Sequence, residues 1–456
     1  MEHWTANRAK MVAVVGALLC ASVGQAAIWD GGGDGTTYDD PLNWDTNVTP
    51  TGSNPVTING ATFGATSGSP LVINLNGVRN IAGATVNVSG HVKFTNSVSG
   101  DDFTTGATGT FNATNVVFDT NIGVVDNATN IANNLNFTNV TYNTPGLGIR
   151  FGAPTTSTIT GSSFTADNVW NLRSGSGTNA ISVIIDSSTT SGRVLTMNNN
   201  SGTVAAASLT VRNGSISTFS GSAAHNIGDI AGANGTPTIT VDNSRVNLRT
   251  TNASGINFNP KAKLVTNNNA IIEMQGHVNN RITNAANFDG EGLTVIFDPL
   301  ASTMATYEVA GTNFGVNSAG LSANYSLDKL ILGTNTGSSM RLVDTVDNDG
   351  AAGSDSLYVD VLELAGDTTL ELNGLGFGYG SLVYNGHSLT IFRFTAPDSD
   401  PLNSRLLTAT NGNEPGIAQS LYTFNHVPEP SSLAVVAFMA ARLLRRRRSA
   451  QTARRR

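Results

Sequence analysis

The sequence contains very little cysteine and no clustered histidine, and both absences exclude kinds of site. The only cysteine is Cys20, so the rest of the chain forms no disulfide and no thiolate metal centre. No two of the six histidines lie at the spacing of a metal site. The chain also lacks a Gly-x-Ser-x-Gly elbow, a phosphate-binding loop and a zincin motif. We therefore predict no catalytic residues, no enzyme activity and no cofactor apart from the calcium considered below.

Charged residues are scarce as well, at 12% of the chain where about 25% is typical. Of the 25 basic and 32 acidic residues, two and one lie in segment 1–26, and eight and one lie in segment 428–456. The intervening body is left with 15 basic and 30 acidic residues. Such an acidic body repels phosphates, which excludes a nucleic-acid partner.

Long apolar stripes with helical spacing are absent from the body, and short alternating runs take their place. These runs have period two and are bounded by Asn, Gly, Asp or Ser, which is typical of strands joined by tight turns. Clear examples are residues 71–75, 85–88, 183–185, 194–197, 209–211, 239–241, 271–274 and 293–297. The sequence thus predicts an all-β protein.

Strands this short favour a right-handed parallel β-solenoid, in which each coil supplies two or three strands. About 400 residues at roughly 20 to 30 per coil predict on the order of fifteen coils. Asparagine suits the corners because it tolerates a left-handed backbone, and segments 198–200 and 267–269 are candidate corners. A string of β-sandwiches is the alternative, since its turns have similar spacing.

The first 26 residues have the pattern of a secretory signal peptide. Arg8 and Lys10 precede an apolar stretch from Met11 to Leu19, and small residues follow. We predict a signal helix that signal peptidase removes by cutting between Ala26 and Ala27.

The last thirty residues combine a proline-rich motif, an apolar run and an arginine block. The run at 431–444 is shorter than the roughly 20 residues of a spanning helix, and Arg442 interrupts it, although its side chain can reach the interface. We predict a short hydrophobic helix with its arginines on the cytoplasmic side. A basic tail that contacts membrane or nucleic acid nonspecifically is the alternative. The motif and block residues are Val427, Pro428, Glu429, Pro430, Arg445, Arg446, Arg447 and Arg448.

This arrangement resembles the PEP-CTERM sorting signal of bacterial exported proteins. The resemblance implies that a membrane-embedded exosortase reads the tail and cuts near Val427 to Pro430. It also implies transient anchoring in the membrane, followed by release or attachment outside the cell.

A tryptophan- and glycine-rich segment follows the signal. Trp29 leads into Asp30 and three glycines, and Trp44 follows. This segment resembles the start of autotransporter-associated β-strand and planctomycete-type surface proteins, with Tyr38 in place of an intermediate tryptophan. We predict that Trp29 and Trp44 cap the first coil. A sugar-stacking platform is the alternative.

Segment 326–395 resembles a module that precedes PEP-CTERM tails in planctomycete-like surface proteins. The resemblance implies that it forms the last coils, with Leu357 to Leu364 as the central strand. Asp344, Asp347 and Asp349 cluster beside a glycine, and such oxygen ligands make them calcium candidates, although a solvated acidic turn is the simpler interpretation.

The predicted division is a signal (1–26), a cap (27–54), a solenoid (55–325), a C-terminal module (326–395), a linker (396–426) and a sorting tail (427–456). The sequence predicts an exported, non-catalytic protein of the cell surface or extracellular matrix, with a structural or adhesive role and extracellular polysaccharide as partner. The alternative is a polysaccharide-binding or polysaccharide-degrading β-helix protein, whose carboxylates meet on adjacent coils. Asp186, Asp242 and Asp298 end short strands and are candidates, although aspartate there usually forms turns.

Overall fold

The chain is described by a computed structural model. It describes residues 26–51, 54–77, 79–80, 83–95, 103–104, 109–119, 133–144, 149–151, 155–172, 180–197, 207–228, 235–251, 253, 255–299, 304–314, 318–322, 324–333, 338–348, 350, 354–364, 368–373, 375–384, 387–395 and 406–409. The predicted signal helix and C-terminal helix lie outside these residues.

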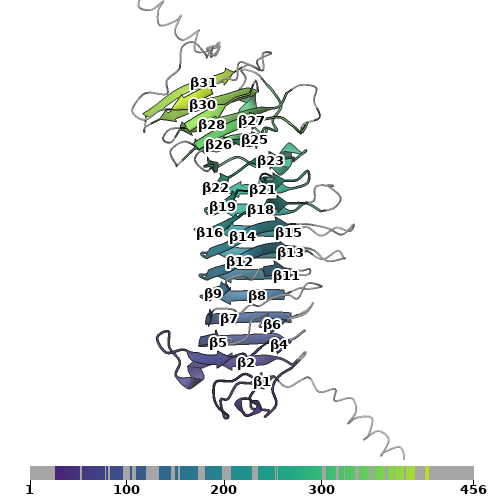
Figure 1. Ribbon diagram of the computed structural model, residues 1–456, viewed down its shortest axis with the longest axis vertical. Coiled ribbons are helices and arrows are strands. Elements are labelled where there is room, and N and C mark those ends of the chain that lie inside the picture. Colours follow the sequence, from purple (N-terminus) through teal and green to yellow (C-terminus); the bar gives the residue numbers. More distant parts are fainter. Residues whose placement is uncertain are drawn as a thin grey trace, which may run out of the picture.

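The strands stack into a rod in which almost all neighbouring strands are parallel (Figure 1). This confirms the prediction of an all-β parallel solenoid, and it excludes a string of sandwiches for the described residues. The part of the rod that has sheet 1 contains about ten turns. Sheet 2 continues beyond it, where the sequence predicted on the order of fifteen coils in all. Several turns are longer than predicted, since Val295 pairs with Leu330 on the next turn. The helical elements described are four short 3-10 turns: η1 (Pro41–Asn43), η2 (Gly60–Phe63), η4 (Ala285–Asn287) and η5 (Ser318–Leu321).

Three sheets run along the rod, and several long strands bend from one sheet into the next. Sheet 1 contains β1 (Ala27–Ile28), β2 (Val56–Asn59), the first parts of β5 (Thr85–Thr95) and β7 (Gly109–Phe118), β8 (Asn133–Thr138), β11 (Thr155–Thr160), β13 (Ile181–Asp186), β15 (Ala207–Arg212), β18 (Thr238–Asp242) and β21 (Lys263–Asn267).

Sheet 2 begins at the far ends of the strands that bend and extends furthest toward the C-terminus. It contains β3 (Leu71–Asn74), the second parts of β5 and β7, β9 (Thr141–Thr144), the first parts of β12 (Ser163–Leu172) and β14 (Thr189–Met197), β16 (Ile216–Gly221), β19 (Arg245–Thr250), β22 (Ala270–Gln275), β24 (Leu293–Phe297), β26 (Leu327–Leu332), β28 (Ser356–Leu364), β30 (Gly376–Tyr384) and β31 (His387–Thr395).

Sheet 3 closes the third side. It contains β10 (Ile149–Phe151), the ends of β12 and β14, β17 (His225–Ile227), β20 (Ile256–Phe258), β23 (Val278–Asn280), β25 (Met304–Glu308), β27 (Ser338–Val343), β29 (Thr368–Glu371) and β32 (Leu406–Ala409). The short strands β4 (Arg79–Asn80) and β6 (Phe103–Thr104) pair with each other apart from these sheets.

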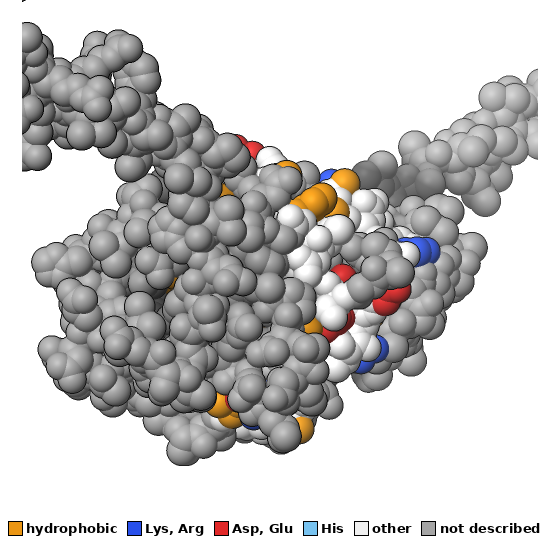
Figure 2. Space-filling model, turned by 90° about the horizontal axis from the view of Figure 1, so that it is seen from above, with side chains coloured by type: hydrophobic (Ala, Val, Ile, Leu, Met, Phe, Trp, Pro, Cys, Tyr) orange, Lys and Arg blue, Asp and Glu red, His pale blue; other side chains and the backbone are white. Residues whose placement is uncertain are grey.

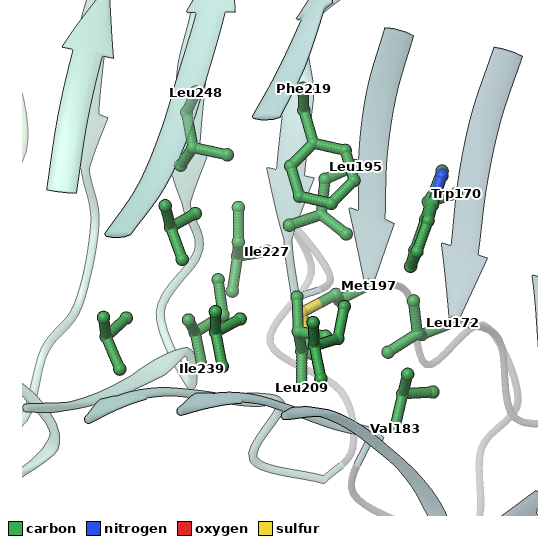
Figure 3. Packing of buried hydrophobic residues seen from close by; sticks show 14 of the residues in the cluster. Trp170, Leu172, Val183, Leu195, Met197, Leu209, Phe219, Ile227, Ile239 and Leu248 are labelled. Atoms are coloured by element: carbon green, nitrogen blue, oxygen red, sulfur yellow. The ribbon is translucent and has the colours of Figure 1, made fainter. Parts of the chain in front are cut away.

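One hydrophobic core fills the rod along its length. In sheet 1, Val183, Leu209 and Ile239 occupy the same position on successive turns, and each is at most 1% exposed. Side chains from facing strands point toward one another across this core (Figure 3). A single turn has too little apolar surface to fold alone, so each turn depends on its neighbours for burial.

The tight corners between sheets 1 and 2 are made by residues with positive φ. Asn139, Asn243 and Asn268 have φ of 54°, 45° and 47°. Asparagine is enriched in this left-handed conformation because its side chain bonds locally. Asn269 also has a positive φ, at 58°, which confirms segment 267–269 as a corner. Segment 198–200 lies outside the described residues.

A column of buried serines ties these corners together from turn to turn. The amide of Ser162 donates to Oγ of Ser188 at 3.0 Å, and the amide of Ser188 donates to Oγ of Ser215 at 3.0 Å. The amide of Ser215 continues the column to Oγ of Ser244 at 3.1 Å. Each hydroxyl satisfies a buried N–H group, which is costly to leave unpaired.

The N-terminal end of the rod is covered by an aromatic cluster. Trp29, Tyr38 and Trp44 are at most 2% exposed, and the ring centroids of Trp44 lie 5.1 Å from Trp29 and 4.9 Å from Tyr38. This confirms that the tryptophans pack as a cap, and their burial excludes a sugar-stacking platform. Beneath them, Asn43 Oδ1 accepts from the amides of Gly33 and Gly35 at 3.0 and 2.8 Å, which wraps the glycine-rich loop around this side chain.

At the other end of the rod, the last described strands pair antiparallel. β31 returns against β30, and β32 pairs antiparallel with β29. β32 therefore lies in the segment that was expected to be a linker. β28 lies between β26 and β30, as predicted for the strand from Leu357 to Leu364.

Candidate ligand-binding groove

A groove forms where the rod loses one of its three sheets. Among the described residues, β21 is the last strand of sheet 1, and Phe288 takes the next position with a single parallel bridge to Leu264. Sheets 2 and 3 continue beyond this point. The missing strand leaves a hollow of about 600 Å³ between β21, η4, residues 321–328 and Asp360 of β28.

Two aromatic rings form the apolar floor of the hollow. Phe288 and Tyr325 are 6% and 5% exposed, and their ring centroids lie 5.8 Å apart. The hydroxyl of Tyr325 donates to the carbonyl of Ile282 at 2.9 Å, which ties the floor to the preceding turn. Tyr325 also has a φ of 53°, a conformation that is uncommon for a bulky side chain.

A second hollow of about 260 Å³ adjoins the first at Tyr325. The two share Ala285, Ser322, Asn324 and Tyr325 among their lining residues. Asn324 fixes this junction, because its Oδ1 accepts from the amide of Thr312 at 2.8 Å and its Nδ2 donates to the Thr312 carbonyl at 2.9 Å. Phe314 lines the second hollow, and 44% of it is exposed.

The first hollow is strongly acidic. Four carboxylates and one basic residue, Lys263, are among its lining residues; the carboxylates are Asp289, Glu291, Asp328 and Asp360. On β26 and β28, Leu327 pairs with Val359 and Lys329 with Val361, so Asp328 and Asp360 face each other on adjacent turns. Neighbouring strands lie about 4.8 Å apart, which brings two like charges close together.

The electrostatics of Asp328 reflect this crowding. Burial raises the pKa of Asp328 above its usual value, and the charges of Asp360 and Glu291 raise it further. The pKa of Asp186, near the middle of the rod, is shifted in the opposite direction. Hydrogen bonds from Asn213 and Arg212 hold its pKa below the usual value despite partial burial. Burial and neighbouring carboxylates therefore both act against the charged form of Asp328 in the groove.

Gly290 lets the chain close the wall of the groove. A Cβ atom at this position would lie 1.8 Å from the carbonyl oxygen of Ser326. The Gly290 carbonyl accepts from the amides of Asp328 and Leu293 at 3.1 and 3.2 Å. Only glycine permits so close a backbone approach, and this contact positions Asp328 at the wall.

Seen along the rod from the C-terminal end, acidic side chains lie among uncharged polar ones on the described part of the surface (Figure 2). This view agrees with the low share of charged residues in the sequence.

The sequence did not single out Asp328 or Asp360, although it contains a signal for them. Leu327 to Leu330 and Val359 to Leu362 share one pattern, in which aspartate follows a buried aliphatic residue and leucine comes two positions later. Two predicted strands with aspartate at the same position indicate stacked carboxylates once the solenoid is assumed. The end of sheet 1, which makes the groove, has no comparable signal.

The three carboxylates predicted from strand ends do not form a site together. Asp186 and Asp242 lie two turns apart in sheet 1, with Arg212 at the same position between them. Asp186 accepts from Nε of Arg212 at 2.8 Å, and Asp242 accepts from Nδ2 of Asn268 at 2.8 Å. Asp298 follows β24 in sheet 2 and is 5% exposed. Asp186 and Asp242 thus serve corners, as the simpler interpretation expects.

The calcium candidates lie on a loop that protein groups hold in place. Asp344 accepts from the amide of Asp355 at 3.0 Å, and Asp347 accepts from the amide of Gly350 at 2.7 Å. Asp349 lies outside the described residues. In the part of the chain that is described, no three His, Cys, Asp or Glu residues are grouped to hold a metal. Calcium binding stays a prediction.

A buried glutamate, Glu308, also holds the loop that carries Asp344 and Asp347. Glu308 is 1% exposed and accepts from N and Oγ1 of Thr345 at 2.5 and 2.6 Å and from the amide of Val346 at 2.8 Å. Burial raises the pKa of Glu308, and these three donors oppose the rise. Glu308 therefore fastens the loop to β25.

The predicted processing sites lie at or beyond the ends of the described chain. Ala26 is partly buried and precedes β1, and the amide of Ala27 donates to the Pro55 carbonyl at 2.9 Å. The sorting residues from Val427 to Arg448 lie outside the described residues. Within the ranges that are described, no helix has the length and apolarity needed to cross a membrane.

Comparison with protein-family models, curated proteins and solved structures finds no match to this chain.

Proposed function

We propose that this chain is an exported, non-catalytic β-solenoid protein of the cell surface or extracellular matrix, with a structural or adhesive role. One observation carries the proposal: a single hydrophobic core runs the length of the described rod, and an aromatic cluster covers its N-terminal end. Such a rod is stiff because each turn is fixed by its neighbours. Its outer polar side chains are left to contact sugars or other molecules.

The export route is part of the same proposal. We take the rod to be a right-handed solenoid, since parallel crossover connections are right-handed in about 98% of cases. The first strand begins at Ala27, so cleavage between Ala26 and Ala27 leaves β1 whole. The tail at Val427 to Arg448 resembles the PEP-CTERM signal, which would make exosortase and signal peptidase the processing partners.

The routing is tested on protein collected from outside the source cells. Mass spectrometry is expected to find Ala27 at the N-terminus and a C-terminus near Val427 to Pro430. Protein found outside the cell with Arg454 to Arg456 intact would contradict processing of the tail. Full-length protein confined to the cytosol would contradict export itself.

A second candidate function, polysaccharide hydrolysis, is favoured by one specific observation. Asp328 and Asp360 face each other across adjacent turns at the wall of a groove. Retaining glycosidases place two carboxyl groups about 5 to 5.5 Å apart, and one of the two has a raised pKa. The direction of the pKa shift of Asp328 matches that of an acid catalyst.

A reducing-sugar assay separates the two functions. The full chain is incubated with neutral, acidic and amine-bearing polysaccharides, and Asp328→Asn serves as the comparison. Under the structural or adhesive function, no new reducing ends form above the buffer blank. Product release by the natural protein that Asp328→Asn abolishes would replace the non-catalytic proposal by the hydrolase.

A further inference from the structure

We propose that the groove beside Phe288 and Tyr325 binds a linear polysaccharide that carries free amino groups, such as a chain of glucosamine units. The proposal rests on the adhesive role proposed above and names the ligand class and the place where it binds. Shape, exposed aromatic surface and charge lead to it separately.

The shape of the groove fits a chain better than a compact molecule. The two hollows share four lining residues, so they lie side by side, with Asp360 lining the first and Phe314 the second. The groove exists because sheet 1 stops at β21 while the other two sheets continue. A ligand lying in it would contact residues of sheet 1, η4 and sheet 2 at once.

Phe314 supplies exposed aromatic surface for a sugar ring. Phe288 and Tyr325 give the first hollow an apolar floor, and Phe314 leaves 44% of its surface exposed in the second. Few large hydrophobic side chains in the described part of the rod are exposed to this degree. Ligand sites commonly combine such apolar walls with a few charged groups that orient the ligand.

The negative charge of the groove favours a ligand that carries positively charged amino groups. Some carboxylates on the described rod meet a cation on an adjacent turn, as Glu363 meets Nζ of Lys329 at 2.5 Å and Glu371 meets Arg341 at 2.8 Å. In the groove, four carboxylates share the wall with Lys263 alone. Asp328 and Asp360 repel each other, and a bound ammonium group relieves that repulsion. A concave wall of one sign also concentrates ligands of the opposite sign.

Isothermal titration calorimetry on the purified full chain at pH 6 tests the proposal with two matched probes. One is a glucosamine hexamer, and the other is an N-acetylglucosamine hexamer of the same length without the charge. We expect the glucosamine hexamer to bind at least about tenfold more tightly, and its affinity to fall as salt is raised.

Two double variants place the site. Asp328→Asn with Asp360→Asn removes the facing charges, and we expect glucosamine-hexamer affinity to fall on the order of tenfold. The control, Asp119→Asn with Asp242→Asn, removes the same charge from outside the groove and is expected to bind as the natural protein does. All four positions lie at the surface or are partly buried, and thermal unfolding verifies that each variant folds.

Two single variants sharpen the result. Lys263→Gln removes the one lysine of the first hollow, so affinity for the glucosamine hexamer is expected to rise roughly twofold. Phe314→Ala is expected to weaken both hexamers, because stacking does not depend on the amine. Opposite signs for Lys263→Gln and the double aspartate variant cannot arise from general damage to the fold.

Three outcomes would overturn the proposal. Equal binding of both hexamers removes the role of the amine. Equal losses in the groove and control variants mean attraction to the acidic body as a whole. Calcium chloride alone producing the full heat of binding at the same residues means a metal site. None of these results concerns export, whereas an intact tail on exported protein would contradict the sorting proposal without affecting the groove.

Discussion

The same stacking geometry carries amides in the first half of the rod and carboxylates at the groove, with opposite consequences. In sheet 1, Nδ2 of Asn112 donates to Oδ1 of Asn87, and Nδ2 of Asn136 donates to Oδ1 of Asn112, both at 2.8 Å. An amide is both donor and acceptor, so a column of amides satisfies itself. Asp328 and Asp360 occupy the corresponding kind of arrangement in sheet 2, but two carboxylates only accept and repel each other.

The comparison shows which outward-facing residues can occupy the same position on successive turns. A turn can be copied along the rod when its outward residues are amides, hydroxyls or alternating charges, as Asp186, Arg212 and Asp242 are. A repeated carboxylate needs a partner from elsewhere. At the groove, carboxylates stack on adjacent turns instead of amides, hydroxyls or alternating charges. Sheet 1 is also missing at this place.

The largest expected effect comes from opening the core of the three-sheet part. Trp170 is fully buried, and its ring centroid lies 5.2 Å from Phe164 and 5.5 Å from Phe219. Trp170→Ala is expected to lower the free energy of unfolding by about 3 to 5 kcal/mol, because a large cavity forms. Urea unfolding measures it, and Val72→Ala on the exposed surface is the control. A loss below about 1 kcal/mol would mean that the turns around Trp170 are not packed as described.

A smaller loss is expected when the serine column is broken. Ser215→Ala removes the oxygen that accepts from the amide of Ser188 and leaves that buried donor unpaired. The expected cost is about 1 to 3 kcal/mol, measured by urea unfolding. Ser182→Ala on partly exposed β13 should change stability little. Equal values for the two would show that water replaces the lost oxygen inside the corner.

The loss of folding stability as pH falls below neutral is expected to depend on His225. Its Nδ1 accepts from the amide of Leu195 at 3.1 Å, and its Nε2 donates to the carbonyl of Arg249 at 3.0 Å, so the ring is neutral. Burial lowers the pKa of His225 below 6.5. The stability that neutral His225 contributes is therefore fully present above the pKa of this histidine in the unfolded chain. It is lost as pH falls through the lower pKa that the histidine has in the folded protein.

Melting temperatures between pH 7.5 and pH 5 give the measurement. His225→Gln keeps one acceptor and one donor but takes up no proton in this range. The natural protein is expected to lose more stability on acidification than the variant does. Parallel curves would show that His225 is protonated as readily in the folded protein as in the unfolded chain.

The smallest effects test the opposed carboxylates directly. Asp328 has a raised pKa, so its ionised form costs stability at pH 7, and Asp328→Asn is expected to raise the melting temperature slightly. Asp186 has a lowered pKa, so Asp186→Asn is expected to lower it. Both changes in melting temperature correspond to less than about 1 kcal/mol in the free energy of unfolding, since surface charges are screened.

Scanning calorimetry at two pH values checks the signs. At pH 3, below the usual aspartate pKa, the difference between the natural protein and Asp328→Asn is expected to vanish. If both variants shift in the same direction at pH 7, the contrast between groove and rod is wrong.

Much of the fold could be predicted because the solenoid is locally encoded. Period-two runs such as Ile181 to Asp186 alternate buried and partly exposed residues as expected. The corner at Asn268 and Asn269 followed from the conformational tolerance of asparagine alone. Burial of Trp29 and Trp44 followed from the need to cover an open stack.

The number of turns and the groove could not be predicted, since both depend on long-range pairing. No sequence signal near Asn267 indicates that sheet 1 ends there, because the end is set by a strand that the described residues between 268 and 324 do not form. Those residues instead make η4, β22 to β25 and the loop before Tyr325. The number of coils depends on the same pairing, since irregular segments between strands make some turns longer than others.

The aromatic cluster at the N-terminal end of the rod has a further consequence. An open solenoid end presents unpaired backbone groups to which a second molecule can add. Trp29, Tyr38 and Trp44 cover this end, so they oppose such addition there. The reach of the rod is then set by its number of turns, at about 4.8 Å for each turn gained or lost.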